Sequence, residues 1–187
     1  ETDIPEDIVD VTQKLWKSYS QKRDTWAQQA QEDAEFRLGR QWTAEQQRIL
    51  LERGQAPLVV NRIHPAVEAA KALLTSGRPQ FRVSPREDSD NRVAQVFNGL
   101  LEYMWYISDG TQALRHVIDD YYTMGLGAMM VYIDPLKDYG RGEVVIRDVD
   151  PLDVYIDPNC RDRLGDDAEN VIISRQFTKE QAMTMYP

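Results

Sequence analysis

The chain has 187 residues, of which 42% are hydrophobic and 28% charged, a composition that is typical of globular proteins and excludes general disorder. Its formal net charge of −9 argues against broad, nonspecific DNA binding, which needs clustered lysine and arginine. The longest apolar run, residues 128–133, is far shorter than the about 20 residues of a membrane span, so no membrane contact is expected. The single cysteine, Cys160, can form no internal disulfide, which fits a reducing compartment. Because the chain does not begin with Met, we interpret it as a piece of a longer protein.

Helices are predicted over most of the first 124 residues. Apolar residues recur three and four positions apart from Ile8 to Ala30, and this narrow stripe predicts a long surface helix. The helix is expected to run from a cap at Asp3 to about Leu38, because Gly39 follows. Further helices are expected after the capping box that begins at Thr43, from a first turn that contains Pro65 to an end before Gly77, over residues 88–107 and after Gly110.

Strands are predicted mainly in the last third of the chain. Residues 58–60 are expected to form a short buried strand and residues 81–83 a second one, because both segments are rich in strand-forming residues. Four more strands are expected over 128–133, 143–149, 152–156 and 170–177, with a hairpin tip at 138–140 and a final helix capped by Thr178. The order predicts an α+β fold, with a mainly helical region over residues 1–124 and a small, mostly antiparallel sheet with a terminal helix over 125–187.

No residue pattern predicts a catalytic, cofactor or metal site. One cysteine and two histidines, His64 and His116, cannot supply the usual zinc ligands. Gly125 and Gly127 follow a helix and precede a strand, the reverse of the phosphate-binding order. The loop that begins at Asp157 departs from the calcium-loop template, which needs Glu at its twelfth position. We therefore expect no enzyme activity.

One enzymatic alternative remains open on the residues alone. A divalent-dependent phosphodiester enzyme needs converging carboxylates, and Asp148, Asp150 and Asp153 are the candidates for that role. A different class of protein, a helical adaptor that binds other proteins, also remains open, because three tryptophans lie in the thin apolar stripe of the first 42 residues. Trp16, Trp26 and Trp42 either contact a partner or pack on the chain's own sheet.

Charge is unevenly distributed along the chain. Residues 36–86 hold nine bases against three acids, whereas residues 148–169 hold eight acids against two bases. Such stretches are either solvated faces of a monomer or surfaces that meet across subunits. If they meet across subunits, the expected contact residues are Arg78, Arg82 and Arg86 on the basic side and Asp162, Asp166 and Asp167 on the acidic side.

Several segments, in chain order, resemble the N-terminal half of bacteriophage portal proteins, especially those of short-tailed phages. The first is the Phe-x-x-Gly-x-Gln-Trp pattern formed by Phe36, Gly39, Gln41 and Trp42. The others are residues 57–63, 77–85, 125–127, 150–159 and 171–181. The resemblance covers about residues 30–187.

This resemblance implies a structural subunit of a dodecameric ring, the head-to-tail connector, at one capsid vertex. DNA would pass through the ring during packaging and ejection, and the partners would be the terminase large subunit, tail adaptor proteins, coat and scaffold. The chain would correspond to the wing region, with the channel-lining stem and the clip further along the polypeptide. The implied location is the portal vertex of the virion, and the host cytoplasm during assembly, with no cofactor.

Overall fold

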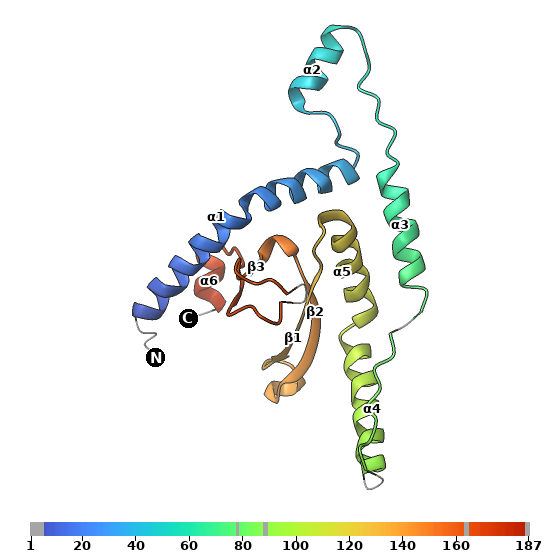
Figure 1. Ribbon diagram of the computed structural model, residues 1–187, viewed down its shortest axis with the longest axis vertical. Coiled ribbons are helices and arrows are strands. Elements are labelled where there is room, and N and C mark those ends of the chain that lie inside the picture. The colour runs from blue at the N-terminus through green and yellow to red at the C-terminus, as the bar shows by residue number, and fades with distance from the viewer. Residues whose placement is uncertain (1–5, 78, 88–89, 163–164, 186–187) are drawn as a thin grey trace. The chain divides into compact units, whose positions relative to one another are not determined.

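The computed structural model describes residues 6–77, 79–87, 90–162 and 165–185 (Figure 1). Helices followed by short antiparallel strands give the predicted α+β class. Asp3, the expected cap of the first helix, lies outside the described residues. No helix in the described ranges is both long and apolar enough to cross a membrane. The elements are α1 Glu6–Arg37, α2 Ala44–Glu52, α3 Ile63–Leu74, α4 Asn91–Ile107, α5 Gly110–Met124, β1 Ala128–Asp134, β2 Glu143–Val149, β3 Val154–Ile156, β4 Val171–Ile173 and α6 Lys179–Met185.

The chain forms two compact units. One, which we call the small unit, comprises Glu1–Gln29 and Asp150–Pro187; the other, the large unit, comprises Ala30–Val149. Helix α1 contributes residues to both. The change from helices to strands lies between Met124 and Ala128, where the sequence predicts it. Packing nevertheless joins the β1–β2 hairpin to the helices of the large unit, because β2 contacts both α4 and α5.

In the large unit, β1 and β2 form an antiparallel hairpin with a continuous register from Ala128 opposite Val149 to Asp134 opposite Glu143. The hairpin turns through a short 3₁₀ segment, η2 (Asp138–Gly140), at the predicted tip. Val145 of β2 is buried. The backbone N–H of Ile146 in β2 donates to Ser108 Oγ at 3.1 Å, which ties β2 to the junction between α4 and α5.

In the small unit, β3 and β4 pair antiparallel, and Arg23 of α1 binds to β3 and the 3₁₀ segment η3 (Pro151–Asp153) before it. The Arg23 guanidinium donates to the carbonyl oxygen of Val154 and, at 2.5 Å, to that of Leu152. It also lies 4.0 Å from the ring centre of Tyr155, against which Trp16 packs. Trp16 therefore contacts the chain's own strand.

The strand expected over residues 58–60 is absent, so that prediction is wrong. The segment is extended, but it has no strand partner among the described residues, and Leu58 and Val60 are each 80% exposed. A composition rich in leucine and valine reports the preference for extended backbone but not the presence of a neighbouring strand.

The strand expected over residues 81–83 is also absent, because a side chain of α4 takes the place of a neighbouring strand. The N–H of Val83 donates to Asn98 Oδ1 at 2.7 Å, and the Val83 carbonyl accepts from Asn98 Nδ2 at 3.1 Å. The ring of Phe81 lies 5.3 Å from that of Trp105. The extended segment thus docks on α4 without joining a sheet.

Candidate interaction surfaces

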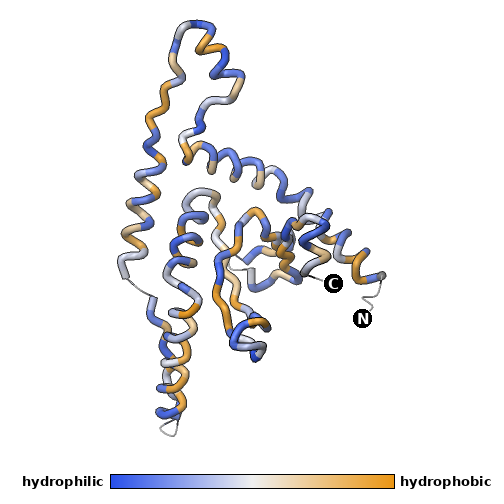
Figure 2. The backbone as a smooth tube through the Cα atoms, turned by 180° about the vertical axis from the view of Figure 1, so that it is seen from behind, coloured by the Kyte–Doolittle hydropathy of each residue, from blue (hydrophilic) through white to orange (hydrophobic). Residues whose placement is uncertain are grey.

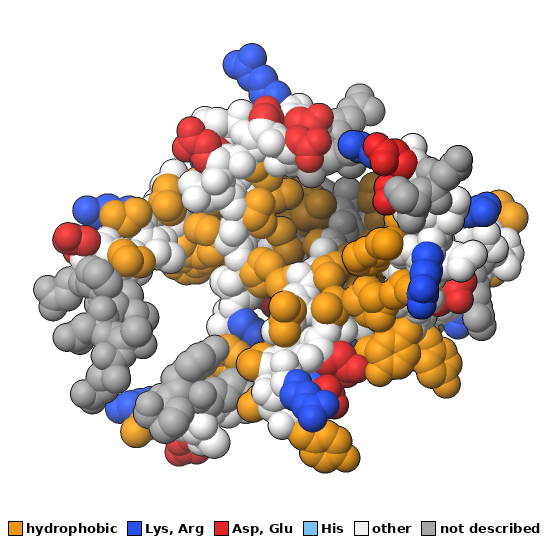
Figure 3. Space-filling view, turned by 90° about the horizontal axis from the view of Figure 1, so that it is seen from below, with side chains coloured by type: hydrophobic (Ala, Val, Ile, Leu, Met, Phe, Trp, Pro, Cys, Tyr) orange, Lys and Arg blue, Asp and Glu red, His pale blue; other side chains and the backbone are white. Residues whose placement is uncertain are grey.

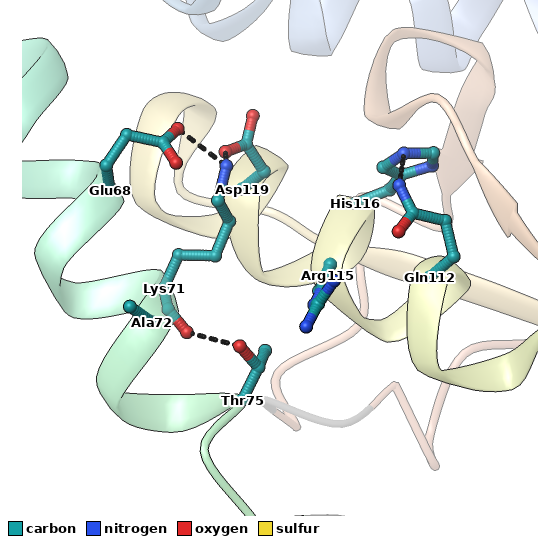
Figure 4. Close-up of a pocket in the computed structure, with 8 residues that line it drawn as sticks. All are labelled: Glu68, Lys71, Ala72, Thr75, Gln112, Arg115, His116 and Asp119. Atoms are coloured by element: carbon teal, nitrogen blue, oxygen red, sulfur yellow. Dashed lines mark hydrogen bonds and ion pairs between the residues drawn. The ribbon is translucent and has the colours of Figure 1, made fainter.

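An ion-pair cluster holds three helices of the large unit together. The Arg37 guanidinium, at the end of α1, binds both carboxylate oxygens of Asp119 in α5 and donates to Glu68 of α3 at 3.0 Å. Lys71 of α3 donates to Glu68 at 2.6 Å and to Asp119 at 2.8 Å (Figure 4). The Arg37 side chain is only 12% exposed, so part of this cluster is shielded from water.

The four charges of the cluster stabilise one another. Hydrogen bonding to Asp119 raises the pKa of Arg37. Burial opposes ionisation of Asp119 and Lys71, yet their mutual hydrogen bond and those to Arg37 and Glu68 lower the pKa of Asp119 and raise that of Lys71. Hydrogen bonding to Lys71 lowers the pKa of Glu68. All four groups are charged at neutral pH, so the cluster fastens helices together and is not suited to proton transfer.

A polar groove of about 430 Å³ adjoins this cluster between α3 and α5 (Figure 4). His116 lies in the wall of this groove. Its Nδ1 is 3.0 Å from Asp148 Oδ2 in β2, and its Nε2 is 2.9 Å from Gln112 Nε2. Within the described ranges, no group of three His, Cys, Asp or Glu residues could hold a metal ion. Asp148, one of the three candidate carboxylates, is therefore the partner of a histidine, and Asp150 caps η3 by accepting from the Leu152 N–H at 2.8 Å.

The glycine of the Phe-x-x-Gly-x-Gln-Trp pattern makes the turn that ends α1. Gly39 has a φ of +83°, a left-handed conformation that favours glycine. Beside it, Asn61 Nδ2 donates at 2.6 Å to the carbonyl oxygen of Arg37, one of the last acceptors of the helix. Asn61 Oδ1 in turn accepts from the N–H groups of Ile63 and His64, which begin α3. The end of α1 and the start of α3 are thus joined through one amide.

The aromatic residues of the same pattern lie on either side of the turn at Gly39, with Phe36 in α1 and Trp42 just before α2. Trp42 Nε1 donates to the carbonyl oxygen of Leu58 at 3.1 Å, and the residue is 37% exposed. Phe36 is exposed to the same extent, and Gln41 is half-buried. Trp42 therefore ties the segment after α2 to the segment before it without entering a core.

The basic residues singled out in the sequence lie in the large unit. Arg82 and Arg86 are exposed and have no ion-pair partner among the described residues, whereas Arg78 lies outside them. Arg37 and Lys71 belong to the same basic stretch but are neutralised inside the cluster. The stretch over residues 36–86 is thus partly neutralised within its own unit.

The acidic residues lie in a loop of the small unit, and one of them organises it. The Asp167 carboxylate accepts from Cys160 Sγ at 2.7 Å and from the N–H groups of Arg161 and Asp162 at 2.9 and 3.0 Å. These hydrogen bonds, with the thiol first, lower the pKa of Asp167 to about 2. Asp166 is exposed, and its N–H donates to the Asp162 carboxylate at 3.3 Å.

A second aspartate, Asp157, supports the same loop from within. It is buried, and its two carboxylate oxygens accept from the N–H of Asn159 at 2.9 Å and from that of Glu169 at 3.4 Å. Its carboxyl group is therefore bound to backbone amides. Asp150 and Asp157 of the 150–159 segment act here as a cap and a turn-former.

Large apolar side chains are uncovered on the large unit. Figure 2 shows hydrophobic residues along the β1–β2 hairpin and α4, and Figure 3 shows hydrophobic side chains gathered in patches on one face of the molecule. Contiguous apolar patches of this kind mark interaction sites. The exposed residues of α4 are Val93, Val96, Phe97, Leu100, Tyr103 and Tyr106, and those of β1 are Met129, Val131 and Ile133.

The uncovered apolar faces of the large unit indicate surfaces that bind another molecule. A family model described as "Phage P22-like portal protein" matches residues 13–187. The chain belongs to the P22-like portal protein family. The resemblance seen in the sequence is thereby confirmed.

A curated relative of this portal chain is a "Portal protein" of Helicobacter pylori bacteriophage KHP30. The two are 22% identical over 138 residues, which make up 74% of this chain and 23% of the relative. The matched region is thus less than a quarter of that protein's length.

Two structural groups of this portal chain escape sequence reasoning. The cluster partners Arg37 and Asp119 lie 82 positions apart, so local spacing does not connect them. The sequence signals one part of the cluster, because Glu68 and Lys71 are three residues apart on one helix face. Arg23 has no local signal at all, because its acceptors are carbonyl oxygens about 130 residues further along.

Proposed function

We propose that this chain is part of the wing region of a portal subunit, and that the subunits form a ring at one capsid vertex. DNA would pass through this head-to-tail connector during packaging and ejection. The terminase large subunit, tail adaptor proteins, coat and scaffold would bind to the ring, which the portal resemblance implies to be a dodecamer. The role is structural, without catalysis or a cofactor. The subunit would lie in the host cytoplasm during assembly and at the portal vertex in the virion.

The observation that carries this proposal is the uncovered apolar surface of the large unit in a member of the portal family. On α4 alone, six large side chains between Val93 and Tyr106 are exposed. Exposed apolar surface of this extent favours association, because burying apolar surface lowers the free energy by about 25 cal/mol per Å². A ring supplies the burial, because each subunit meets two neighbours through different faces.

Electron microscopy of the purified full-length protein, combined with a mass measurement in solution, tests the proposal. We expect closed rings of twelve subunits. A stable monomer at the concentrations present during assembly would favour the helical adaptor instead.

A hydrolysis assay with divalent cations tests the enzymatic alternative. Asp150→Ala removes both the carboxylate and the cap of η3, whereas Asp150→Asn keeps a capping oxygen. DNA hydrolysis by the wild-type protein that both variants abolish would contradict a purely structural role.

A further inference from the structure

Strand β1 is an open edge of the β1–β2 hairpin. In an antiparallel pair, residues that do not exchange hydrogen bonds direct their N–H and C=O groups away from the partner strand. Ile146 donates outward to Ser108, so Ile146 and the opposite residue, Val131, form such a pair. The backbone groups of Met129 and Ile133, two positions either side, therefore also point away from β2. None of these three has a hydrogen-bond partner there among the described residues.

The two edges of the hairpin differ in their cover. On the outer edge of β2, the Ile146 N–H is bound by Ser108, and β2 contacts both α4 and α5, whereas β1 contacts α5. In β1, every second side chain is exposed, and these exposed side chains are apolar, with Val131 64% and Ile133 68% exposed. A long, apolar edge strand without lysine, proline or a bulge is a template for strand addition. The register of β1 is continuous over seven residues, and none of them is Lys or Pro.

The same unit carries a segment that is suited to fill such an edge. Residues 58–60 are extended, and Leu58 and Val60 are 80% exposed. Trp42 binds the Leu58 carbonyl on one side of the segment, while the N–H and C=O of Val59, which point to the other side, have no partner among the described residues.

The open edge and the unpaired segment do not meet within one copy. In Figure 1 the segment lies beside α2, at the far end of the large unit from the tip of the hairpin. Helix α2 has no buried residue, so this end of the unit stands clear of the rest. Charge favours the contact only slightly: residues 40–62 hold four arginines against two glutamates, a net of +2, and residues 128–149 hold four acids against three bases, a net of −1. The chain thus supplies both halves of a strand pair, which points to a second copy as the occupant.

We propose that the segment Leu58–Val60 of one copy adds as a strand to the outer edge of β1 in a second copy. The main-chain groups of Val59 would bind those of β1, and the apolar side chains of both strands would cover one another. Because a different surface of each copy is used, the contact is head-to-tail and generates a closed ring when the rotation closes. This inference rests on the proposed ring and names a contact that builds it.

Disulfide trapping in the assembled full-length protein tests the pairing. In a Cys160→Ser background, Val59→Cys is combined in turn with Met129→Cys, Val131→Cys and Ile133→Cys, which covers the possible registers. Paired strands bring Cα atoms within the 4.4–6.8 Å that a disulfide needs. We expect at least one pair to give, on oxidation, a reducible ladder of covalent multimers. The matched control joins Val59→Cys to Val93→Cys, an exposed apolar position on α4, and should give none.

A backbone variant tests the same contact without new covalent chemistry. Val131→Pro removes an outward N–H and leaves the hydrogen bonds between β1 and β2 in place, because edge strands accept proline on their open side. We expect a folded subunit by circular dichroism and a loss of rings in electron microscopy. Val131→Thr keeps the N–H and should form rings.

The possible outcomes separate the two proposals. Rings that form normally with Val131→Pro, or cysteine pairs that close only within a chain, overturn the strand addition and leave the portal ring intact. Absence of rings from the wild-type protein contradicts the ring itself.

Discussion

The guanidinium of Arg37, the last residue of α1, binds both carboxylate oxygens of Asp119 in α5, with Nη2 2.6 Å from Oδ1. A paired arrangement of this kind fixes the direction of both side chains as well as their separation. Lys71 of α3 binds the same carboxylate, so one aspartate links three helices. Removing it would leave Arg37 and Lys71 to share Glu68 as their remaining carboxylate in this partly shielded site.

Asp119→Ala is expected to lower the free energy of unfolding by about 1.5–3 kcal/mol, the range for hydrogen bonds to charged groups. The matched control is Glu35→Ala, which removes the largely exposed partner of Arg40 and should cost about 0–1 kcal/mol. Urea denaturation followed by circular dichroism measures both. Equal losses in the two variants would mean that the cluster contributes no more than a surface pair.

The cluster also predicts a pH dependence. The pKa of Asp119 is lowered in the folded protein, so its contribution is fully present above the unfolded value of about 4 and is lost as pH falls through the folded value. The pKa values of Arg37 and Lys71 are raised, so their contributions are lost only as pH rises through those values in the strongly alkaline range. We expect the unfolding free energy of the wild-type protein to fall more steeply below about pH 4 than that of Asp119→Asn. Parallel acid slopes would contradict this assignment.

Gly127 and Gly99 should respond in opposite ways to alanine. A Cβ on Gly127 would lie 2.4 Å from the carbonyl oxygen of Val117 in α5, whereas nothing lies within 4 Å of one on Gly99 in α4. Gly127→Ala is expected to destabilise the protein by about 1–3 kcal/mol through overpacking. Gly99→Ala should stabilise it by about 0.5–1 kcal/mol, since alanine favours the helix. Thermal unfolding checks the signs, and a harmless Gly127→Ala would show that β1 can move away from α5.

Trp42 contributes one hydrogen bond and partial packing, because its ring is not in a core. The 3–5 kcal/mol cost of deleting a buried tryptophan therefore does not apply. Trp42→Phe, which removes the bond to the Leu58 carbonyl and keeps an aromatic ring, is expected to cost about 0.5–1.5 kcal/mol. Chemical denaturation measures it. A loss above this range would indicate that the indole holds the segment after α2 in place more strongly than one hydrogen bond can.

Local sequence signals predicted much of this fold. The capping box at Thr43, whose side chain accepts from the Gln46 N–H at 3.2 Å, is confirmed, as is the turn at Gly39. The hairpin tip at 138–140 is confirmed as well. Each signal acts within a few residues, through a cap, a positive φ or a turn, and does not depend on the distant fold.

The sequence could not show which partners lie far away along the chain. Residues 58–60 and 81–83 have the composition of strands, but the first segment has no strand partner among the described residues and the second is bound by the side chain of Asn98. The ion-pair cluster could not be predicted for the same reason, because no local spacing in the sequence connects Arg37 with Asp119. Long-range pairing is decided by packing, which composition does not report.

The structure shows which acidic residue is suited to test the proposed charge contact between subunits. Asp167 binds three donors within its own loop, so Asp167→Lys would disrupt that loop whatever happens at an interface. The Asp166 carboxylate has no such donor among the described residues, and the residue is exposed. Asp166→Lys is therefore the informative acidic variant, and Asp167→Lys is a control for damage to the loop.

Arg82 and Arg86 are exposed and unpaired in the described part of the chain, so their reversal to glutamate should not unfold the subunit. We expect the double variant, or high salt, to shift the full-length protein from rings toward monomers. Each exposed pair is worth only about 0–1 kcal/mol, but a closed ring repeats the contact in every subunit. Adding Asp166→Lys to the same chain should partly restore the rings, and size-exclusion chromatography with light scattering measures the shift. Rings that persist equally in all three proteins at low and high salt would show that these arginines face solvent or another partner.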